Sequence, residues 1–246
     1  MRLKSFRNLL VTLLCVCCFG NAIAEATLTG HTAEIRFLGF LPDGKTLLSG
    51  ADDSSIRRWD TDTGMAVGFW QQVPKFDSAP STVILSQSAN GRLLARGGKG
   101  QGSVDIWDID RVAMLRTFQA HQRPTVGVAL SGDGTLLASF SQSDMRVWDA
   151  ISGKTRFFVN APNLYAFLAL AVSADGRKVA ASSSDKKIAL FDVTTATQIS
   201  QFDGGPGQLL ALAFSPDGRY LASGSDGGDD QSLKVWDLTN GLPIAV

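Results

Sequence analysis

Apolar residues in this chain come in short runs, and each run is followed by a polar turn that contains glycine. The five runs before these turns are Ile35 to Phe40, Val83 to Leu85, Val126 to Leu130, Phe167 to Val172 and Leu209 to Phe214. Short apolar runs bounded by glycine and aspartate predict β-strands. No stretch beyond the N-terminal segment keeps the 3.6-residue period of an amphipathic helix. The pattern therefore predicts an all-β protein and disfavours a helical solenoid.

The turns have glycine at a fixed place, and a second short apolar segment follows each of them. The turn sequences are Pro42-Asp43-Gly44, Ala89-Asn90-Gly91, Gly132-Asp133-Gly134, Ala174-Asp175-Gly176 and Pro216-Asp217-Gly218. Asp-Gly and Asn-Gly favour hairpins because glycine adopts a positive φ without a Cβ clash. A polar loop, a third strand and a weaker fourth strand then complete the unit. Met114 to Phe118 is an example of the fourth strand.

The third strand of every unit ends in an aromatic residue and an aspartate. These closing pairs are Trp59-Asp60, Trp107-Asp108, Trp148-Asp149, Phe191-Asp192 and Trp236-Asp237. Four antiparallel strands repeated at this interval are typical of the blades of a β-propeller. We expect five blades, at about residues 30–73, 81–119, 121–159, 163–203 and 207–246. The first strand is expected to lie innermost, buried on both faces, and the fourth to lie at the outer edge.

The first unit carries Gly30-His31, Ser49, Asp53 and Trp59-Asp60. With these residues and the repeat, the chain resembles the WD-repeat (WD40) β-propeller family from Leu28 to Val246. The resemblance implies that the histidine, serine, aspartate and tryptophan form a hydrogen-bonded set. Such a set ties the loop before the blade to its second and third strands. Buried imidazole and indole groups need partners of this kind.

The later units keep this set only in part. Its remaining members are His121, Ser139 and Trp148 in the third unit, Asp185 in the fourth, and Ser223, Asp230 and Trp236 in the fifth. In the third unit the loop is one residue short, and Asp144 comes only four residues before the tryptophan. The fourth unit has Ala181 and Phe191 in place of the serine and tryptophan. The second keeps Trp107 alone, with Gln101 where the aspartate would be.

The first 24 residues have the features of a secretory signal peptide. Arg2, Lys4 and Arg7 precede the apolar stretch Leu9 to Phe19, and Ala22-Ile23-Ala24 forms a cleavage pattern before Glu25. The apolar stretch is shorter than the roughly twenty residues that a membrane span needs. We therefore expect residues 1–24 to be removed and residues 25–246 to be exported. A buried or interfacial helix is the alternative for this segment.

The positions of the cysteines and the net charge bear on the expected cellular location and partners. All three cysteines, Cys15, Cys17 and Cys18, lie in the expected signal, so the mature chain would form no disulfide and offer no thiolate. An exported chain without cysteine favours a bacterial envelope, as a periplasmic or secreted protein. The formal net charge is zero and there is no run of basic residues. We therefore expect no nucleic-acid partner and, after cleavage, no stable membrane span.

We find no residue pattern that indicates catalysis or a cofactor. Both histidines of the chain occupy the structural position of the repeat. Gly97 to Ser103 is rich in glycine, but it lacks the spacing of a phosphate loop and leads into a strand. Asp226 to Asp230 contains three carboxylates, so a calcium site is an alternative for this stretch. It lacks the spacing of an EF-hand, and a solvated loop is favoured. The expectation is a non-enzymatic protein without cofactor or metal.

The remaining functional candidates are large or charged side chains on the side of the second-to-third-strand loops. They are Lys99, Arg123, Phe140 and Tyr165. Loops on a rigid scaffold carry binding groups, and aromatic and arginine side chains anchor interfaces. The leading hypothesis is an exported scaffold that mediates protein–protein interaction through this loop face. An envelope enzyme or small-ligand binder with the same fold is the alternative.

A further hypothesis concerns closure of the propeller. In the WD-repeat family the chain starts with an outer strand of the last blade, and Ala26-Thr27-Leu28 is similar to that strand. Leu242 to Val246, however, begins an outer strand of the fifth unit itself. Both cannot occupy one place, and the resemblance implies more than five blades. The chain would then be a partial propeller completed by another polypeptide or by further repeats, with exposed sheet faces that drive association.

Overall fold

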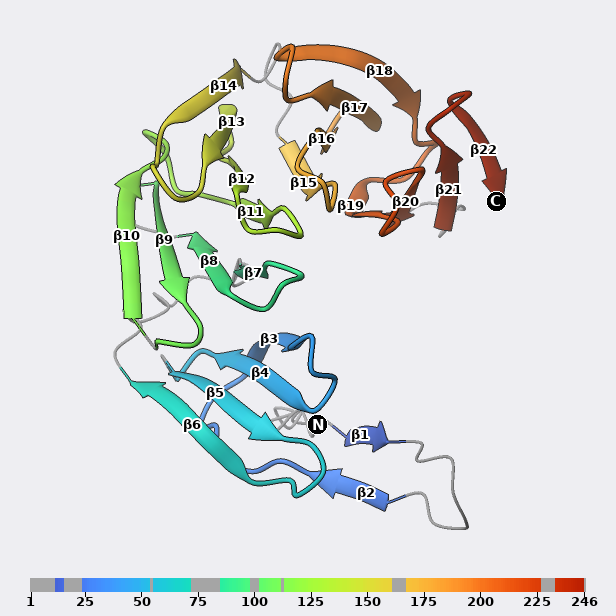
Figure 1. Cartoon of the computed structure of the whole chain (residues 1–246). Coiled ribbons are helices and arrows are strands. Elements are labelled where there is room, and N and C mark those ends of the chain that lie inside the picture. Colours follow the sequence, from blue (N-terminus) through green and yellow to red (C-terminus); the bar gives the residue numbers. More distant parts are fainter. Residues whose placement is uncertain are drawn as a thin grey trace, which may run out of the picture. The chain divides into compact units, whose positions relative to one another are not determined.

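The predicted all-β fold is confirmed by the computed structural model, which describes residues 12–15, 24–53, 55–71, 85–97, 102–111, 113–160, 167–226 and 233–245. Five four-stranded antiparallel sheets form the blades of a β-propeller (Figure 1). The chain divides into two compact units, Met1–Val83 with blade one and Ile84–Val246 with blades two to five. The described ranges include no helix with the length and apolar character needed to cross a bilayer.

The four strands of each blade are hydrogen-bonded in the order in which they occur in the sequence. Blade one comprises β3 (Ile35–Phe40), β4 (Thr46–Ala51), β5 (Ser55–Asp60) and β6 (Ala66–Gln71). Blade two comprises β7 (Leu85–Gln87), β8 (Leu93–Gly97), β9 (Ser103–Asp108) and β10 (Ala113–Gln119). Blade three comprises β11 (Gly127–Leu130), β12 (Leu136–Phe140), β13 (Asp144–Asp149) and β14 (Thr155–Asn160). Blade four comprises β15 (Phe167–Val172), β16 (Lys178–Ser183), β17 (Lys187–Asp192) and β18 (Thr197–Asp203). Blade five comprises β19 (Leu209–Phe214), β20 (Tyr220–Ser225), β21 (Leu233–Asp237) and β22 (Leu242–Ala245).

In blades two to five the turn between the first two strands is built from a serine, an acidic or amide residue and a glycine. In blade three Ser131 Oγ donates to Asp133 Oδ1 at 2.6 Å and accepts from the Leu136 N–H at 2.9 Å. Gly134 has a φ of +74°, in the left-handed region that glycine adopts without strain. Local side-chain bonds and one glycine therefore set the hairpin, which is why the turn is visible in the sequence.

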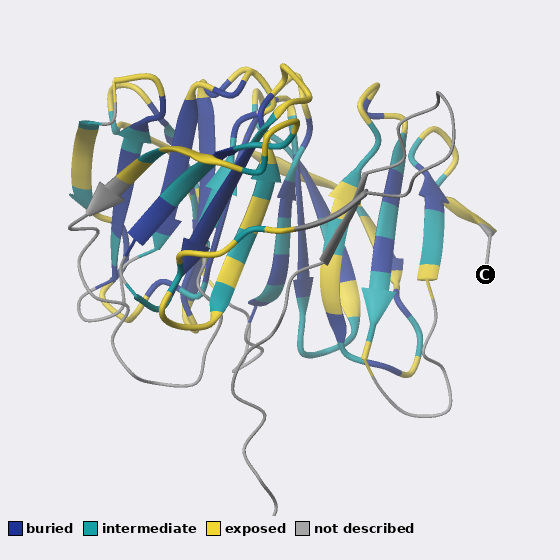
Figure 2. Ribbon diagram, turned by 90° about the horizontal axis from the view of Figure 1, so that it is seen from below, coloured by how far each residue is buried: buried dark blue, intermediate teal, exposed yellow. Residues whose placement is uncertain are grey.

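Consecutive blades of the second unit pack face to face. We call the side of a blade that carries its closing tryptophan or phenylalanine the front face and the opposite side the back face. The front face of blade three, with Leu137 and Trp148, packs on the back face of blade two. Blades four and five repeat this arrangement on blades three and four. Figure 2 shows the resulting core as dark blue strands, with exposed residues in the turns and along several strands.

Main-chain hydrogen bonds also join the first turns of neighbouring blades. The Asn90 N–H of blade two donates to the Gly132 carbonyl of blade three at 2.9 Å. The Gly132 N–H in turn donates to the Ala174 carbonyl of blade four at 3.1 Å. These bonds form a seam that runs from blade two to blade four at one end of the strands.

Two strands lie before the first blade. β1 (Thr12–Cys15) pairs antiparallel with β2 (Ala24–Thr27), with Thr12 opposite Thr27 and Cys15 opposite Ala24. The expected cleavage position, after Ala24, is therefore within β2. The outer strand of blade five is β22, so β2 does not take that place in the sheet.

The first strands differ in two details from the predicted ones. The first strand of blade two is predicted at Val83 to Leu85, of which Val83 and Ile84 lie outside the described residues; β7 covers Leu85–Gln87, because Ser86 and Gln87 also pair with β8 despite their polarity. The first strands were also expected to be buried on both faces. β11 is buried throughout, whereas exposed residues alternate along β3. Burial of a first strand thus depends on what lies on each side of its blade.

Candidate functional site

The second and third strands of a blade bring a serine and a tryptophan to one face. In blade three Leu137 is paired with Trp148, and Ser139 with Arg146, across β12 and β13. Side chains alternate along a strand, so these four residues share the front face. The indole of Trp148 thereby lies near the hydroxyl of Ser139.

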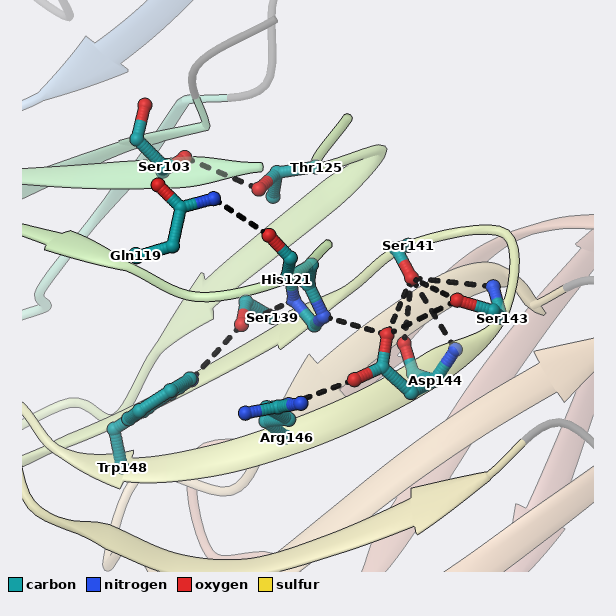
Figure 3. Close-up of polar contacts among 10 residues, drawn as sticks. All are labelled: Ser103, Gln119, His121, Thr125, Ser139, Ser141, Ser143, Asp144, Arg146 and Trp148. Carbon is teal, nitrogen blue, oxygen red and sulfur yellow. Dashed lines mark hydrogen bonds and ion pairs between the residues drawn. The ribbon is translucent and has the colours of Figure 1, made fainter. Parts of the chain in front are cut away.

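A set of polar side chains in blade three connects these strands to the preceding loop (Figure 3). Trp148 Nε1 donates to Ser139 Oγ at 2.9 Å. Ser139 Oγ lies 2.9 Å from His121 Nε2, and His121 Nδ1 lies 2.8 Å from Asp144 Oδ1. Arg146 Nε donates to the other oxygen of Asp144 at 2.7 Å. We call His121, Ser139, Asp144 and Trp148 the blade-three network.

The partners of His121 determine which of its nitrogens carries the proton. The Asp144 carboxylate only accepts, so Nδ1 donates to it and Nε2 accepts from the Ser139 hydroxyl. Burial lowers the pKa of His121, and this effect exceeds the opposing attraction of Asp144. Burial would raise the pKa of Asp144, but hydrogen bonds from Ser141 and Arg146 outweigh it and lower that pKa. A neutral imidazole beside an ionised carboxylate follows at neutral pH.

The loop that carries His121 is also fixed against blade two. The His121 N–H donates to the Gly102 carbonyl at 2.9 Å, and Thr125 Oγ1 donates to the Ser103 carbonyl at 3.1 Å. A Cβ at Gly102 would lie 2.3 Å from the carbonyl oxygens of His121 and Arg123, and its φ is +66°. Glycine is therefore required there. The loop is held by blade two on one side and by the blade-three network on the other.

Blade one contains the same set of residues in its own unit. His31 Nε2 lies 2.6 Å from Ser49 Oγ, and Trp59 Nε1 donates to the same oxygen at 2.7 Å. His31 Nδ1 lies 2.9 Å from Asp53 Oδ2. Burial would raise the pKa of Asp53, but hydrogen bonds led by that of Ser55 lower it. The four residues that carry the family resemblance are thus in contact.

Blades four and five contain only fragments of the set. In blade five Trp236 Nε1 donates to Ser223 Oγ at 3.0 Å, while Asp230 lies outside the described residues. Blade four has Ala181 and Phe191 on its front face, so neither an indole nor a hydroxyl needs a partner. Asp185 accepts from the Ser183 hydroxyl in its own turn.

Blade two replaces the serine with a charged residue. Arg96 takes that position opposite Asp105, and their side chains are 7% and 8% exposed with the nearest nitrogen and oxygen 3.9 Å apart. Asp105 also accepts from Thr117 Oγ1 at 2.7 Å. The buried Nε1 of Trp107 has no hydrogen-bond partner among the residues that the structure describes. An ion pair has therefore taken the place of the serine–tryptophan bond.

The order of serine, histidine and aspartate in the network is also that of a hydrolase triad. The blade-three network differs from a catalytic triad in solvent access, because Ser139 is 0% exposed and His121 is 2% exposed. The indole of Trp148 also occupies the Ser139 oxygen, which a nucleophile would need to direct at a substrate. The arrangement therefore locks a loop and does not present a nucleophile. Within the described ranges no three His, Cys, Asp or Glu side chains are grouped to hold a metal ion.

The four predicted partner contacts have different outcomes. Arg123 is exposed in the fixed loop before blade three. The prediction for Phe140 is wrong, because this residue is 3% exposed and belongs to the core between blades three and four. Its ring fills the space beside Gly127, where a Cβ would lie only 1.8 Å away. Lys99 and Tyr165 lie outside the described residues.

Sequence reasoning missed the role of Asp144. Its position four residues before Trp148 departs from the pattern of blade one. The shorter loop places it at the start of β13, within 2.8 Å of His121. It is the sole acidic residue between Ser139 and Trp148 in the sequence, and that signal was available. Arg146 was missed too, although its guanidinium carbon lies 5.9 Å from the Trp148 ring centroid.

Comparison with known proteins agrees with this geometry. The sequence model of the WD40 family, described as "WD domain, G-beta repeat", matches residues 24–60, 113–149 and 196–237. Each matched segment ends within a third strand, at or near the closing aromatic–Asp pair. The described geometry and the matches define a β-propeller repeat protein. The chain carries WD40 repeats in these three segments.

Several curated proteins are similar to nearly the whole chain. Protein tipD of Dictyostelium discoideum is 26% identical over 90% of this chain and 36% of its own length. Pre-mRNA-processing factor 17 of Mus musculus is 23% identical over 89% of the chain and 38% of its length. A guanine nucleotide-binding protein subunit beta of Oryza sativa subsp. indica is 26% identical over 88% of the chain and 60% of its length. The chain thus spans between about a third and three fifths of these relatives.

These relatives correct the predicted location. The N-terminal pattern and the distribution of cysteine predicted a signal peptide and a periplasmic or secreted protein of a bacterial envelope. The relatives are eukaryotic proteins, and two kinds are named for pre-mRNA processing and for U3 small nucleolar RNA. The prediction of export is therefore wrong. A short apolar segment preceded by basic residues occurs also outside exported proteins, and β1 (Thr12–Cys15) is part of such a segment here.

Proposed function

We propose that this chain is a non-enzymatic scaffold that binds a protein partner through the loop before blade three. The observation that carries the proposal is the way in which this loop is held. Gln122, Arg123 and Pro124 are exposed, while the residues on both sides of them, His121 and Thr125, are buried and hydrogen-bonded. A partner would meet three consecutive exposed residues whose backbone is already ordered.

Order of this kind favours binding because little conformational entropy is left to lose. Arginine is also among the side chains that most often anchor interfaces, through its planar set of N–H donors. Arg123 is therefore the residue that we propose as the main contact. The other half of the proposal, the lack of enzymatic activity, is supported by the burial of Ser139 and His121 described above.

The proposal also specifies the class of partner, a protein and not a nucleic acid. The WD40 repeats support a protein partner, and the zero formal net charge of the chain does not favour binding of nucleic acid. Two relatives are nevertheless named for pre-mRNA and U3 small nucleolar RNA. The lack of a nucleic-acid partner stays a prediction.

A charge reversal in the loop tests the proposal. Wild-type chain, Arg123→Glu and Lys154→Glu are each crosslinked gently in extract of the source cells, and the bound proteins are quantified. Lys154 is also exposed, but it lies in the turn between β13 and β14, so it controls for loss of a positive charge. We expect a protein that the wild type and the control recover equally and that Arg123→Glu binds at least about tenfold more weakly. Equal recovery by all three proteins would contradict the assignment of the loop.

A further inference from the structure

Lys186 has a backbone conformation for which most turns of this chain have glycine. Its φ is +67°, in the left-handed region, where a Cβ causes steric strain that glycine avoids. Ala196 is the other residue besides glycine with a positive φ in the described ranges. Lys186 lies in the turn between β16 and β17, and a glycine there would remove the strain. A strained residue other than glycine is a candidate for a functional side chain.

The backbone of Lys186 is held from two sides. Its N–H donates to the Ser183 carbonyl and its carbonyl accepts from the Gly204 N–H, each at 2.9 Å. Gly204 belongs to the loop before blade five and is buried, and a Cβ there would lie 2.2 Å from the side chain of Leu209. Neighbouring segments therefore fix the left-handed conformation, and the side chain of Lys186 extends from an ordered backbone.

The ammonium group of Lys186 has no acidic partner among the described residues. Lys186 is half-buried, and it makes no side-chain hydrogen bond or ion pair with any residue that the structure describes. A second ammonium lies nearby, since Lys234 Nζ of blade five donates to the Gly204 carbonyl at 3.1 Å. The acid next to Gly204 is Asp203, whose Oδ1 accepts from the Gly205 N–H at 3.1 Å. Two lysines thus lie beside one loop, and within the described ranges neither forms an ion pair.

Lys186 and Arg123 lie at the same end of their blades. We call this end the loop face, and it carries the loops before the first strands and the turns between the second and third strands. In blade three such a loop and such a turn meet through His121 and Asp144. The bond between Gly204 and Lys186 joins the same two kinds of segment in blades five and four. Arg123 is exposed and, like Lys186, forms no ion pair among the described residues.

We propose that the loop face of blades three and four, through Arg123 and Lys186, binds an acidic segment of the protein partner. The inference rests on the proposed function and adds the chemistry of the partner. Positive side chains without acidic partners attract carboxylates, and salt screens this attraction. A single-stranded nucleic acid also carries negative charge, but its bases are bound by stacking on aromatic side chains. The described loops at this end of blades three to five contain no exposed aromatic residue.

Substitution by glycine separates binding from stability at position 186. Lys186→Gly removes the ammonium and the left-handed strain together, so we expect it to raise the thermal midpoint while it weakens binding. Ala196→Gly is the matched control, because it relieves strain in the turn between β17 and β18, at the opposite end of the blade. Lys186→Arg keeps the positive charge and is expected to retain binding.

Binding is measured by fluorescence anisotropy with a short, labelled polyglutamate peptide and the full-length chain. We expect the wild type, Lys186→Arg and Ala196→Gly to bind the peptide equally, and all three to bind it more weakly as the salt concentration rises. Lys186→Gly is expected to bind about two- to fivefold more weakly. Arg123→Glu reverses a charge and is expected to bind more weakly still. A polylysine peptide and an oligouridylate of the same length are the comparison ligands, and neither is expected to bind.

The possible contrary results have separate meanings. No binding of polyglutamate by the wild type, or equal binding by the wild type and Lys186→Gly, would overturn the inference. Stronger binding of the oligouridylate than of polyglutamate would overturn it in favour of a nucleic acid. A loss of binding in Arg123→Glu alone would remove Lys186 from the site and leave the proposed loop in place. A loss in Lys186→Gly alone would instead remove Arg123, and with it the assignment of the loop before blade three.

Discussion

Ser139 is the residue on which the blade-three network depends, and its replacement by alanine has a calculable cost. The hydroxyl accepts from Trp148 Nε1 and contacts His121 Nε2, each at 2.9 Å. Ser139→Ala leaves both nitrogens buried without this partner, and an orphaned buried polar group costs about 1–3 kcal/mol. We therefore expect Ser139→Ala to lower the free energy of unfolding by about 2–6 kcal/mol, far more than the loss of one oxygen from a surface.

Blade four indicates how this cost can be reduced. It has Ala181 and Phe191 at the two positions, and both are buried without a polar atom to satisfy. Trp148→Phe removes the indole N–H, so Ser139→Ala made in that background leaves only the His121 nitrogen unpaired. The cost of the alanine is then expected to fall by about 1 kcal/mol or more. The loss of indole volume is common to both proteins with phenylalanine and cancels from the comparison.

Urea unfolding of four proteins measures this coupling. They are the wild type, the two single variants and the double variant, followed by far-UV circular dichroism because the substitution at position 148 changes the fluorescence. Similar slopes of free energy against urea are required for the comparison. An equal cost of Ser139→Ala in both backgrounds would refute the reasoning, since it would show that the serine and the tryptophan contribute independently.

Two other predictions concern a turn and a titration. Ala196 has a φ of +57° where the corresponding turns of blades one, three and five have glycine. Ala196→Gly is therefore expected to stabilise the protein by about 0.5–1 kcal/mol. A thermal midpoint that is unchanged or lower would contradict this, and Gly153→Ala, at one of those turns, is the control in the opposite direction. The lowered pKa of His121 means that the unfolded chain binds its proton more readily, so the stability from this residue is complete above pH 6.5 and is lost as the pH falls below that value. Denaturation midpoints should therefore decline over this range, by at most about 1.4 kcal/mol per pH unit from one proton, and the decline should be smaller in His121→Asn; an equal decline in the variant would mean that other groups cause it.

The blades were predictable because their signals are local. Gly134 and its counterparts are required by the φ of a single turn, and the serine and aspartate that complete the turn are within a few residues of it. The aromatic–Asp pair marks the end of a third strand for a similar reason. In blade three Asp149 accepts from the Ser152 N–H of the next turn at 2.8 Å. A pattern with local causes is repeated wherever the turn is repeated.

The errors concern features that depend on residues distant in the sequence. The position of Phe140 at the end of a second strand predicts an exposed side chain beside the loop. Gly127, on the neighbouring strand, instead leaves the space that the Phe140 ring fills. Asp144 reaches His121 because a shorter loop starts β13 earlier, and the distance between them is set by the pairing of two strands and not by spacing.

The seam of main-chain hydrogen bonds between first turns bears on how these blades can diverge. Asn90 and Gly132 donate through their backbone N–H groups, so the bonds need no particular side-chain chemistry, although a Cβ at Gly132 would lie only 3.0 Å from the Ala174 carbonyl oxygen. Substitutions can therefore accumulate at the turns of successive repeats while the blades keep their alignment with one another. Proline is excluded at both donor positions, because it has no N–H to donate. The sequences of such repeats can therefore diverge beyond recognition while the arrangement of the blades is kept.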